Sequence, residues 1–129
     1  MKHLAELHIH TEISSEILFL KKEIEFLLKI LRNCYSTSIN LEKIKLLDSY
    51  WTNFEQNIDK LDLLSVRIKK EEKNLAILYK EELIDSQITK FMEDHLQAEY
   101  KEINKAVKVL KKSFYEYMHG CNACALKTA

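Results

Sequence analysis

The sequence predicts an all-α protein, an up-down-up antiparallel three-helix bundle with a very long second helix. Its 129 residues include one glycine and no proline. Because these two residues interrupt helices and shape tight turns, their scarcity favours long helices. Apolar residues recur at alternating spacings of three and four in three segments, which is the period of a helical stripe. Short connections separate the segments and make consecutive helices antiparallel neighbours.

The first helix is predicted from a stripe within residues 13–31. Its apolar members follow one another at spacings of 4, 3, 4, 3 and 4 and are Ile13, Ile17, Leu20, Ile24, Leu27 and Leu31. This is one helix face with a coiled-coil-like seam. We expect the helix to end near Cys34 or Tyr35, and Ser38 or Asn40 to cap the next helix.

The second helix is expected over about residues 41–83. The seam alternates between spacings of three and four throughout and consists of Ile44, Leu47, Trp51, Phe54, Ile58, Leu61, Ser65, Ile68, Glu72, Leu75 and Tyr79. At 1.5 Å per residue, such a helix would be about 65 Å long.

The third helix is expected to begin at Asp85 or Ser86 and to end at Gly120, because glycine readily adopts the left-handed conformation that terminates helices. Its apolar face is predicted to comprise Ile88, Met92, Ile103, Ala106, Val107, Leu110, Phe114 and Tyr117. The bundle is therefore assigned to residues 1–118, and residues 119–129 form a cysteine-containing tail.

Charge and composition exclude several classes of function. Lys and Arg together number 20, as do Asp and Glu, whereas proteins that bind nucleic acid usually carry a basic excess. No segment reaches the roughly 20 apolar residues of a membrane span. The first residues lack the apolar core of a signal peptide. We therefore expect a cytoplasmic protein with three reduced cysteines and neither nucleic acid nor membrane as a partner.

Polar residues continue the apolar seam at one end of the predicted bundle. The first seam, extended backwards, passes through His10, Glu6 and His3, and Glu72 lies on the second seam. If the two turns are centred near residues 37.5 and 85, His3 lies opposite Glu72, and Glu72 lies opposite position 98. The predicted cluster comprises His3, Glu6, His10, Glu72, His95 and Glu99, with Glu16, Glu71 and Tyr79 as nearby alternates.

This cluster is a candidate metal site. Imidazole and carboxylate groups together suit iron, manganese or zinc, and unpaired charges in a core are costly. The ligand types, with the His95-x3-Glu99 pair, resemble those of ferritin-like and hemerythrin-like bundles, which implies a carboxylate-bridged metal centre, even a di-iron one. Those families use four helices, and this chain has three. Two alternatives are a solvated, salt-bridged bundle end and a polar groove that binds a partner.

The cysteines define a second candidate site at the opposite end. The tail holds His119, Cys121 and Cys124. The same two turn centres place this tail near Cys34 at the end of the first helix. These four residues would suit a Cys3His zinc site, and two tails from two chains would also suit one shared zinc. A reversible Cys121–Cys124 disulfide is a further interpretation, as is a tail with two ordinary thiols.

The chain as a whole resembles small uncharacterised three-helix-bundle proteins of Bacteroidota. The segments that carry this resemblance are EILFLKKEIEFLLKIL, KIKLLDSYWTNFEQNIDKL and SFYEYM. The resemblance implies the fold and no particular activity.

Three classes of function follow from the sequence. The first, which the sequence favours, is a metal-binding bundle for metal or oxygen sensing or storage. The second is a structural or adaptor bundle that forms a homodimer or binds a helical protein, and it predicts an exposed apolar stripe on the second helix, beyond the reach of the third helix. The third is an enzyme at a di-metal site, for which the sequence names no catalytic residue.

Overall fold

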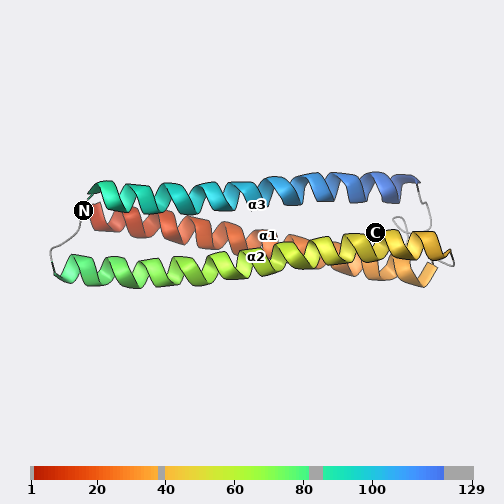
Figure 1. The fold of residues 1–129 in the computed structure, drawn as a ribbon, viewed down its shortest axis with the longest axis horizontal. Helices are drawn as coiled ribbons and strands as arrows, with labels where there is room; N and C mark the ends of the chain where they lie inside the picture. Colours follow the sequence, from red (N-terminus) through yellow and green to blue (C-terminus); the bar gives the residue numbers. More distant parts are fainter. Residues whose placement is uncertain (1, 38–39, 82–85, 121–129) are drawn as a thin grey trace.

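The computed structural model contains three long helices, α1 (Lys2–Thr37), α2 (Leu41–Lys80) and α3 (Ser86–Gly120). It describes residues 2–37, 40–81 and 86–120, and of residues 2–11, 79, 86 and 88 only the backbone. α1 and α3 run in one direction and α2 in the other, and α1 lies behind the other two in Figure 1. The described residues contain no strand. The predicted up-down-up three-helix bundle is therefore confirmed.

The helix ends agree closely with the capping signals. Asn40 caps α2, because its Oδ1 accepts a hydrogen bond from the Glu42 amide at 2.8 Å and its carbonyl accepts one from the Ile44 amide. α1 continues past the predicted stop to Thr37, and α2 ends at Lys80, three residues before the predicted one. α3 ends at Gly120, the residue predicted for the end of the third helix.

The core uses only half of the seam predicted for α2. Leu47, Phe54, Leu61, Ile68 and Leu75 are buried, but the alternate members Trp51, Ile58, Ser65 and Glu72 are only half-buried. Their places are taken by residues one position earlier, namely Tyr50, Asn57 and Leu64. A helix that packs against two neighbours buries a wider wedge than the two positions per heptad of a simple coiled-coil seam.

α3 buries a face slightly rotated from the predicted one. Ile103, Val107 and Phe114 are buried as expected, whereas Ala106 is exposed. Met118 joins the core, where Phe114 packs against the rings of Tyr50 and Phe54 at centroid distances of 5.3 and 5.6 Å. These tilted and edge-to-face contacts hold α2 and α3 together near the end of α1.

Polar contacts between the helices fix their register. Tyr35 donates to Asp48, and Lys21 pairs with Asp62 at 2.5 Å, so the residue numbers of each α1–α2 pair sum to 83. The α2–α3 contacts give sums of 163 to 166, from Tyr50 with Ser113 and Arg67 with Glu99. The predicted register, with sums of 75 and 170, is therefore wrong by about two turns for α1–α2 and by about one to two turns for α2–α3.

None of the described helices is both long and apolar enough to cross a membrane.

Candidate functional site

The six residues of the candidate metal cluster divide into two groups. His3, Glu6 and His10 lie on the helical backbone at the start of α1, but their side chains lie outside the described ones. Glu72 is half-buried on α2, and His95 and Glu99 lie on α3. With the observed register, Glu72 is level with residue 11 of α1 rather than with residue 3.

The two candidate ligands on α3 make contacts of other kinds. The carboxylate of Glu99 pairs with the Arg67 guanidinium at 2.6 Å. His95 is exposed, and its ring stacks on Phe91 with 6.4 Å between the centroids. Among the described side chains, no three His, Cys, Asp or Glu residues form a group that suits a metal ion. The metal site therefore stays a prediction, centred on side chains near the start of α1.

Glu72 offers a direct test of this prediction. Glu72 lies at the edge of the core, between the buried residues Ile68 and Leu75. A leucine at position 72 would therefore have apolar neighbours on the same face of α2. We expect Glu72→Leu to raise the free energy of unfolding by about 1 kcal/mol in urea titrations. The matched change Glu55→Leu, on the exposed face of α2, is expected to stay within about 0.5 kcal/mol. Stoichiometric iron, manganese or zinc in the purified protein that disappears in Glu72→Leu would instead support the metal site.

The cysteine site is placed only in part. Cys34 is fully buried at the end of α1, and His119 is exposed in the last turn of α3. Cys121 and Cys124 lie outside the described residues. The zinc, disulfide and simple-thiol interpretations all remain predictions.

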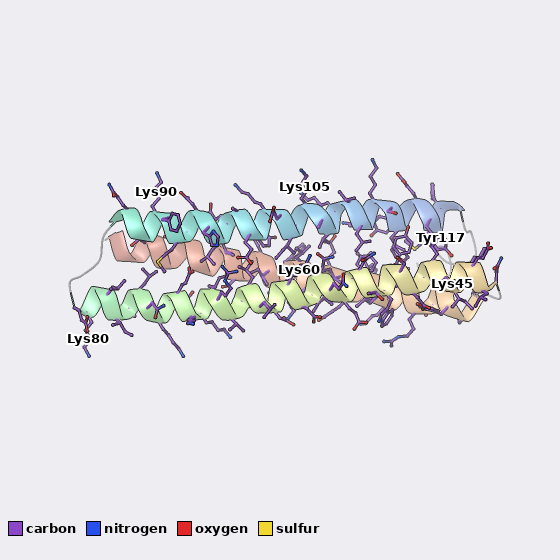
Figure 2. All side chains as sticks on the ribbon, viewed as in Figure 1. Lys45, Lys60, Lys80, Lys90, Lys105 and Tyr117 are labelled. Carbon is purple, nitrogen blue, oxygen red and sulfur yellow. The ribbon has the colours of Figure 1, made fainter. Side chains whose placement is uncertain are left out.

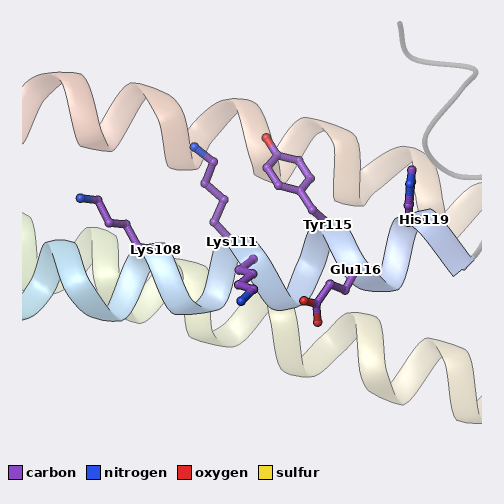
Figure 3. A pocket seen from close by; sticks show the side chains of 6 residues that line it. Lys108, Lys111, Tyr115, Glu116 and His119 are labelled. Atoms are coloured by element: carbon purple, nitrogen blue, oxygen red, sulfur yellow. The ribbon is translucent and has the colours of Figure 1, made fainter.

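A hollow of about 510 Å³ lies near this end and is lined by α3 residues, including Lys108, Tyr115 and His119. Figure 3 shows Lys111 and Tyr115 on one side of the helix and Glu116 on the other. Lys111 donates to Glu23 of α1, which raises the pKa of Lys111. Exposed lysines of this kind are ordinary for a helix surface, so the hollow defines no ligand.

A groove with a volume of about 1210 Å³ lies between α2 and α3. We call it the α2–α3 groove. Three exposed aliphatic side chains line it, with exposed fractions of 65% for Leu63, 63% for Val66 and 64% for Val109. The other lining residues are Asn53, Gln56, Asn57, Lys60, Arg67, Glu99, Glu102, Ile103, Lys105, Ala106, Leu110 and Ser113.

The wall of the α2–α3 groove is low where α3 carries the small side chain of Ala106. This residue was predicted to be buried on the apolar face of α3, but it is exposed and lines the groove. The ends are marked by the Arg67–Glu99 ion pair and by the hydrogen bond between Tyr50 and Ser113 at 2.8 Å. Fourteen residues separate Arg67 from Asn53 on α2, which gives a length of about 20 Å.

Charge is unevenly distributed along the α2–α3 groove. Lys60 and Lys105 are exposed and lie at the same level of the bundle, as Figure 2 shows. Arg67 and Glu99 neutralise each other, and Glu102 lies nearly one turn from Lys105. The lining as a whole carries three basic and two acidic side chains, so its middle is weakly positive.

Asn57 is the buried polar residue of the α2–α3 groove. Its side chain is only 7% exposed, and Nδ2 donates to the Asn53 carbonyl at 2.8 Å. Its Oδ1 accepts no hydrogen bond from the part of the chain that the structure describes. The apolar pattern of the sequence does not single out this residue, although Tyr50, Asn57 and Leu64 recur at intervals of seven.

Comparison with known proteins gives no match to a family model, to a curated protein or to a solved structure.

Proposed function

We propose that this chain is a helix-binding adaptor, and that the α2–α3 groove receives one amphipathic helix of a partner protein. The observation that carries the proposal is the set of exposed side chains Leu63, Val66 and Val109 around one groove. Grooves between helices with exposed aliphatic walls are a common docking surface for an apolar helix face. The sequence-based adaptor hypothesis placed its exposed apolar stripe on the second helix beyond the reach of the third, whereas Leu63 and Val66 lie on α2 beside α3.

The size of the α2–α3 groove favours a polypeptide. Its volume of about 1210 Å³ exceeds the roughly 300–1,000 Å³ of most small-molecule sites. Its length of about 20 Å corresponds to about 14 residues of helix. With a width of about 10 Å between neighbouring helix axes, its footprint is on the order of 200 Å², well below the roughly 800 Å² per partner of a stable dimer. A single docked helix fits these dimensions better than a second copy.

The charges support the same occupant. A second copy centred on the α2–α3 groove would bring Lys60 and Lys105 close to the same lysines of the other copy. Like charges placed together in an interface disfavour that pairing. A partner helix with an aspartate or glutamate beside its apolar stripe would complement them. We therefore commit to an acidic amphipathic helix as the occupant.

Selection of peptides tests this proposal. Displayed 14-residue helix-forming peptides are selected on the full chain, and the recovered peptides are synthesised for fluorescence-anisotropy titration. We expect apolar residues at i, i+3 or i+4, and i+7, with an acidic residue alongside. The double variant Lys60→Glu/Lys105→Glu is expected to weaken binding about tenfold. Changing the acidic residue of the peptide to lysine should restore it.

The control is Lys22→Glu/Lys29→Glu, two exposed lysines of α1, which should leave binding unchanged. Two results would refute the proposal. One is the recovery of peptides that lack the apolar stripe, and the other is binding that the control variant Lys22→Glu/Lys29→Glu weakens as much as Lys60→Glu/Lys105→Glu does. If no peptide is recovered and light scattering finds a dimer that Lys60→Glu/Lys105→Glu alters, the occupant is a second copy instead.

A further inference from the structure

We propose that the surface formed jointly by α1 and α3, on the side of the bundle away from α2, binds the surface of a bilayer that contains anionic lipids. We call it the α1–α3 face, and it consists of one stripe of exposed residues on each helix. The inference does not depend on the proposed function, because the α2–α3 groove lies on another side of α3.

The stripe on α1 lies next to the contact with α3. Glu23 faces α3, because its carboxylate pairs with Lys111, whereas Lys21 faces α2. At about 100° per residue, Phe26 is about 60° around α1 from Glu23 and about 140° from Lys21. Phe26 is therefore beside the contact with α3, on the side away from α2. Spacings of 3, 4 and 3 place four exposed residues in this stripe, namely Phe19, Lys22, Phe26 and Lys29.

The stripe on α3 borders the same contact. Lys111 faces α1, and Glu99 faces α2, where it pairs with a guanidinium. Tyr115 is about 40° around α3 from Lys111 and about 160° from Glu99. Figure 3 shows Lys108 and Tyr115 on the side of α3 from which Lys111 extends. The exposed residues of this stripe are Lys108, Lys112 and Tyr115.

The two stripes lie at the same level of the bundle. α1 and α3 run in the same direction, and the pair formed by Glu23 and Lys111 gives an offset of 88 residues between them. Phe26 is therefore level with residue 114, next to Tyr115. The exposed fractions are 71% for Phe19, 57% for Phe26 and 42% for Tyr115. Three large aromatic side chains thus stand exposed on one face.

The lysines of the α1–α3 face are available to an anionic partner. Four of them are exposed and take part in none of the ion pairs of the described residues, namely Lys22, Lys29, Lys108 and Lys112. The acidic residues Glu25 and Glu116 lie at the outer edges of the face. Lysines alone are ordinary on a helix surface, and the exposed aromatic rings between them distinguish this one.

A bilayer surface is the partner that suits both kinds of side chain. Phenylalanine and lysine together are typical of segments at the membrane interface, where rings enter the boundary of the acyl chains and ammonium groups remain among the headgroups. Each lysine also adds attraction to an anionic leaflet. A second copy on this face would instead bring Lys22 and Lys29 close to the same lysines. Recognition of nucleic acid favours the forked guanidinium of arginine, whereas the cations of both stripes are lysines.

The stripes run along the helices, so the bundle would lie with its long axis parallel to the bilayer. The expectation of no membrane partner was drawn from the lack of a spanning segment, and binding to the bilayer surface needs none. α2 would point away from the lipid. The exposed residues Leu63 and Val66 of the α2–α3 groove lie on α2, so a partner helix could dock there at the same time.

Sedimentation with vesicles tests the inference. The full chain is mixed with sucrose-loaded vesicles of phosphatidylcholine alone, or with about 30% phosphatidylserine added, at about 0.1 M salt. We expect the chain to sediment with the vesicles that contain phosphatidylserine and to stay in solution with phosphatidylcholine alone. Raising the salt to about 0.5 M should release most of the chain, because salt screens the attraction between lysine and lipid.

Two double variants test the two kinds of side chain separately. Phe19→Ser/Phe26→Ser removes the rings of the α1 stripe, and Lys108→Glu/Lys112→Glu reverses the charge of the α3 stripe. Each should weaken binding to vesicles that contain phosphatidylserine at least about tenfold. All four side chains are exposed, so the variants should fold, and thermal unfolding followed by circular dichroism checks this.

The matched controls lie on α2. Leu46→Ser/Ile77→Ser removes two apolar side chains with exposed fractions of 43% and 55%. Lys69→Glu/Lys73→Glu reverses two exposed lysines at the same spacing of four residues. Both controls should leave vesicle binding unchanged.

Several results would overturn the inference. One is a lack of sedimentation with either kind of vesicle, and another is equal sedimentation with both. A third is a loss in the α2 controls as large as in the variants of the face. If the lysine variant loses binding and the phenylalanine variant keeps it, the face binds polyanions by charge alone, and titration with a single-stranded oligonucleotide would show whether nucleic acid is the partner instead. Peptide binding to the α2–α3 groove is measured without lipid, so either proposal can fail alone.

Discussion

Phe114→Ala is expected to lower the free energy of unfolding by about 3–5 kcal/mol. Phe114 is fully buried, and its ring contacts those of Tyr50 and Phe54 at 5.3 and 5.6 Å. Alanine removes these contacts and leaves a cavity between α2 and α3. Since domains are typically stable by about 5–15 kcal/mol, this loss takes a large part of the total. Urea unfolding followed by circular dichroism measures it.

Tyr115→Ala is the matched control, because Tyr115 is the adjacent aromatic residue on the same helix and is 42% exposed. Its ring has Lys111 at 5.9 Å from the centroid, an interaction worth about 0.5–1 kcal/mol at an exposed site. We expect a loss of about 1 kcal/mol or less. Equal losses in the two variants would contradict the buried face assigned to α3.

The three helices were predictable because they depend on local chemistry. The absence of proline and the regular apolar spacing indicate long helices, the Asn40 side chain caps the start of α2, and α3 ends at Gly120, the one glycine of the chain. The buried face of α2 was harder to predict. The third helix covers one side of α2 and buries Tyr50, Asn57 and Leu64 there. The apolar spacing along α2 does not predict on which side the third helix packs.

The candidate metal site was misplaced because opposing residues were assigned by counting outwards from the centre of each turn. This counting places His3 opposite Glu72 and assumes a symmetrical turn, whereas the observed pairs place α2 about two turns further along α1. Register depends on the path of the connection and on packing, and a repeating seam satisfies several registers equally well. The α2–α3 groove could not be predicted for the same reason. Leu63 of α2 and Val109 of α3 line one groove, and this can be seen only when the register of the two helices is known.

Val109→Glu is expected to abolish most binding of a peptide selected on the α2–α3 groove, with an affinity loss of about 30-fold to 100-fold. The change removes an aliphatic side chain worth about 1.5 kcal/mol when buried. It also places a carboxylate near the acidic residue of the partner, where it must lose water on docking. Val109 is 64% exposed in the unbound chain, so folding should be unaffected to within about 0.5 kcal/mol. Anisotropy titration and urea unfolding measure the two effects separately.

Phe26→Glu distinguishes the α2–α3 groove from apolar surface in general. Phe26 is 57% exposed on α1, outside the groove, so the substitution removes comparable apolar surface and adds the same charge. Full binding by Phe26→Glu together with the loss in Val109→Glu would assign the peptide to the α2–α3 groove. Equal weakening in both variants would mean that the peptide recognises exposed apolar residues without a defined site. The helix-binding proposal would then fail even though the fold stands.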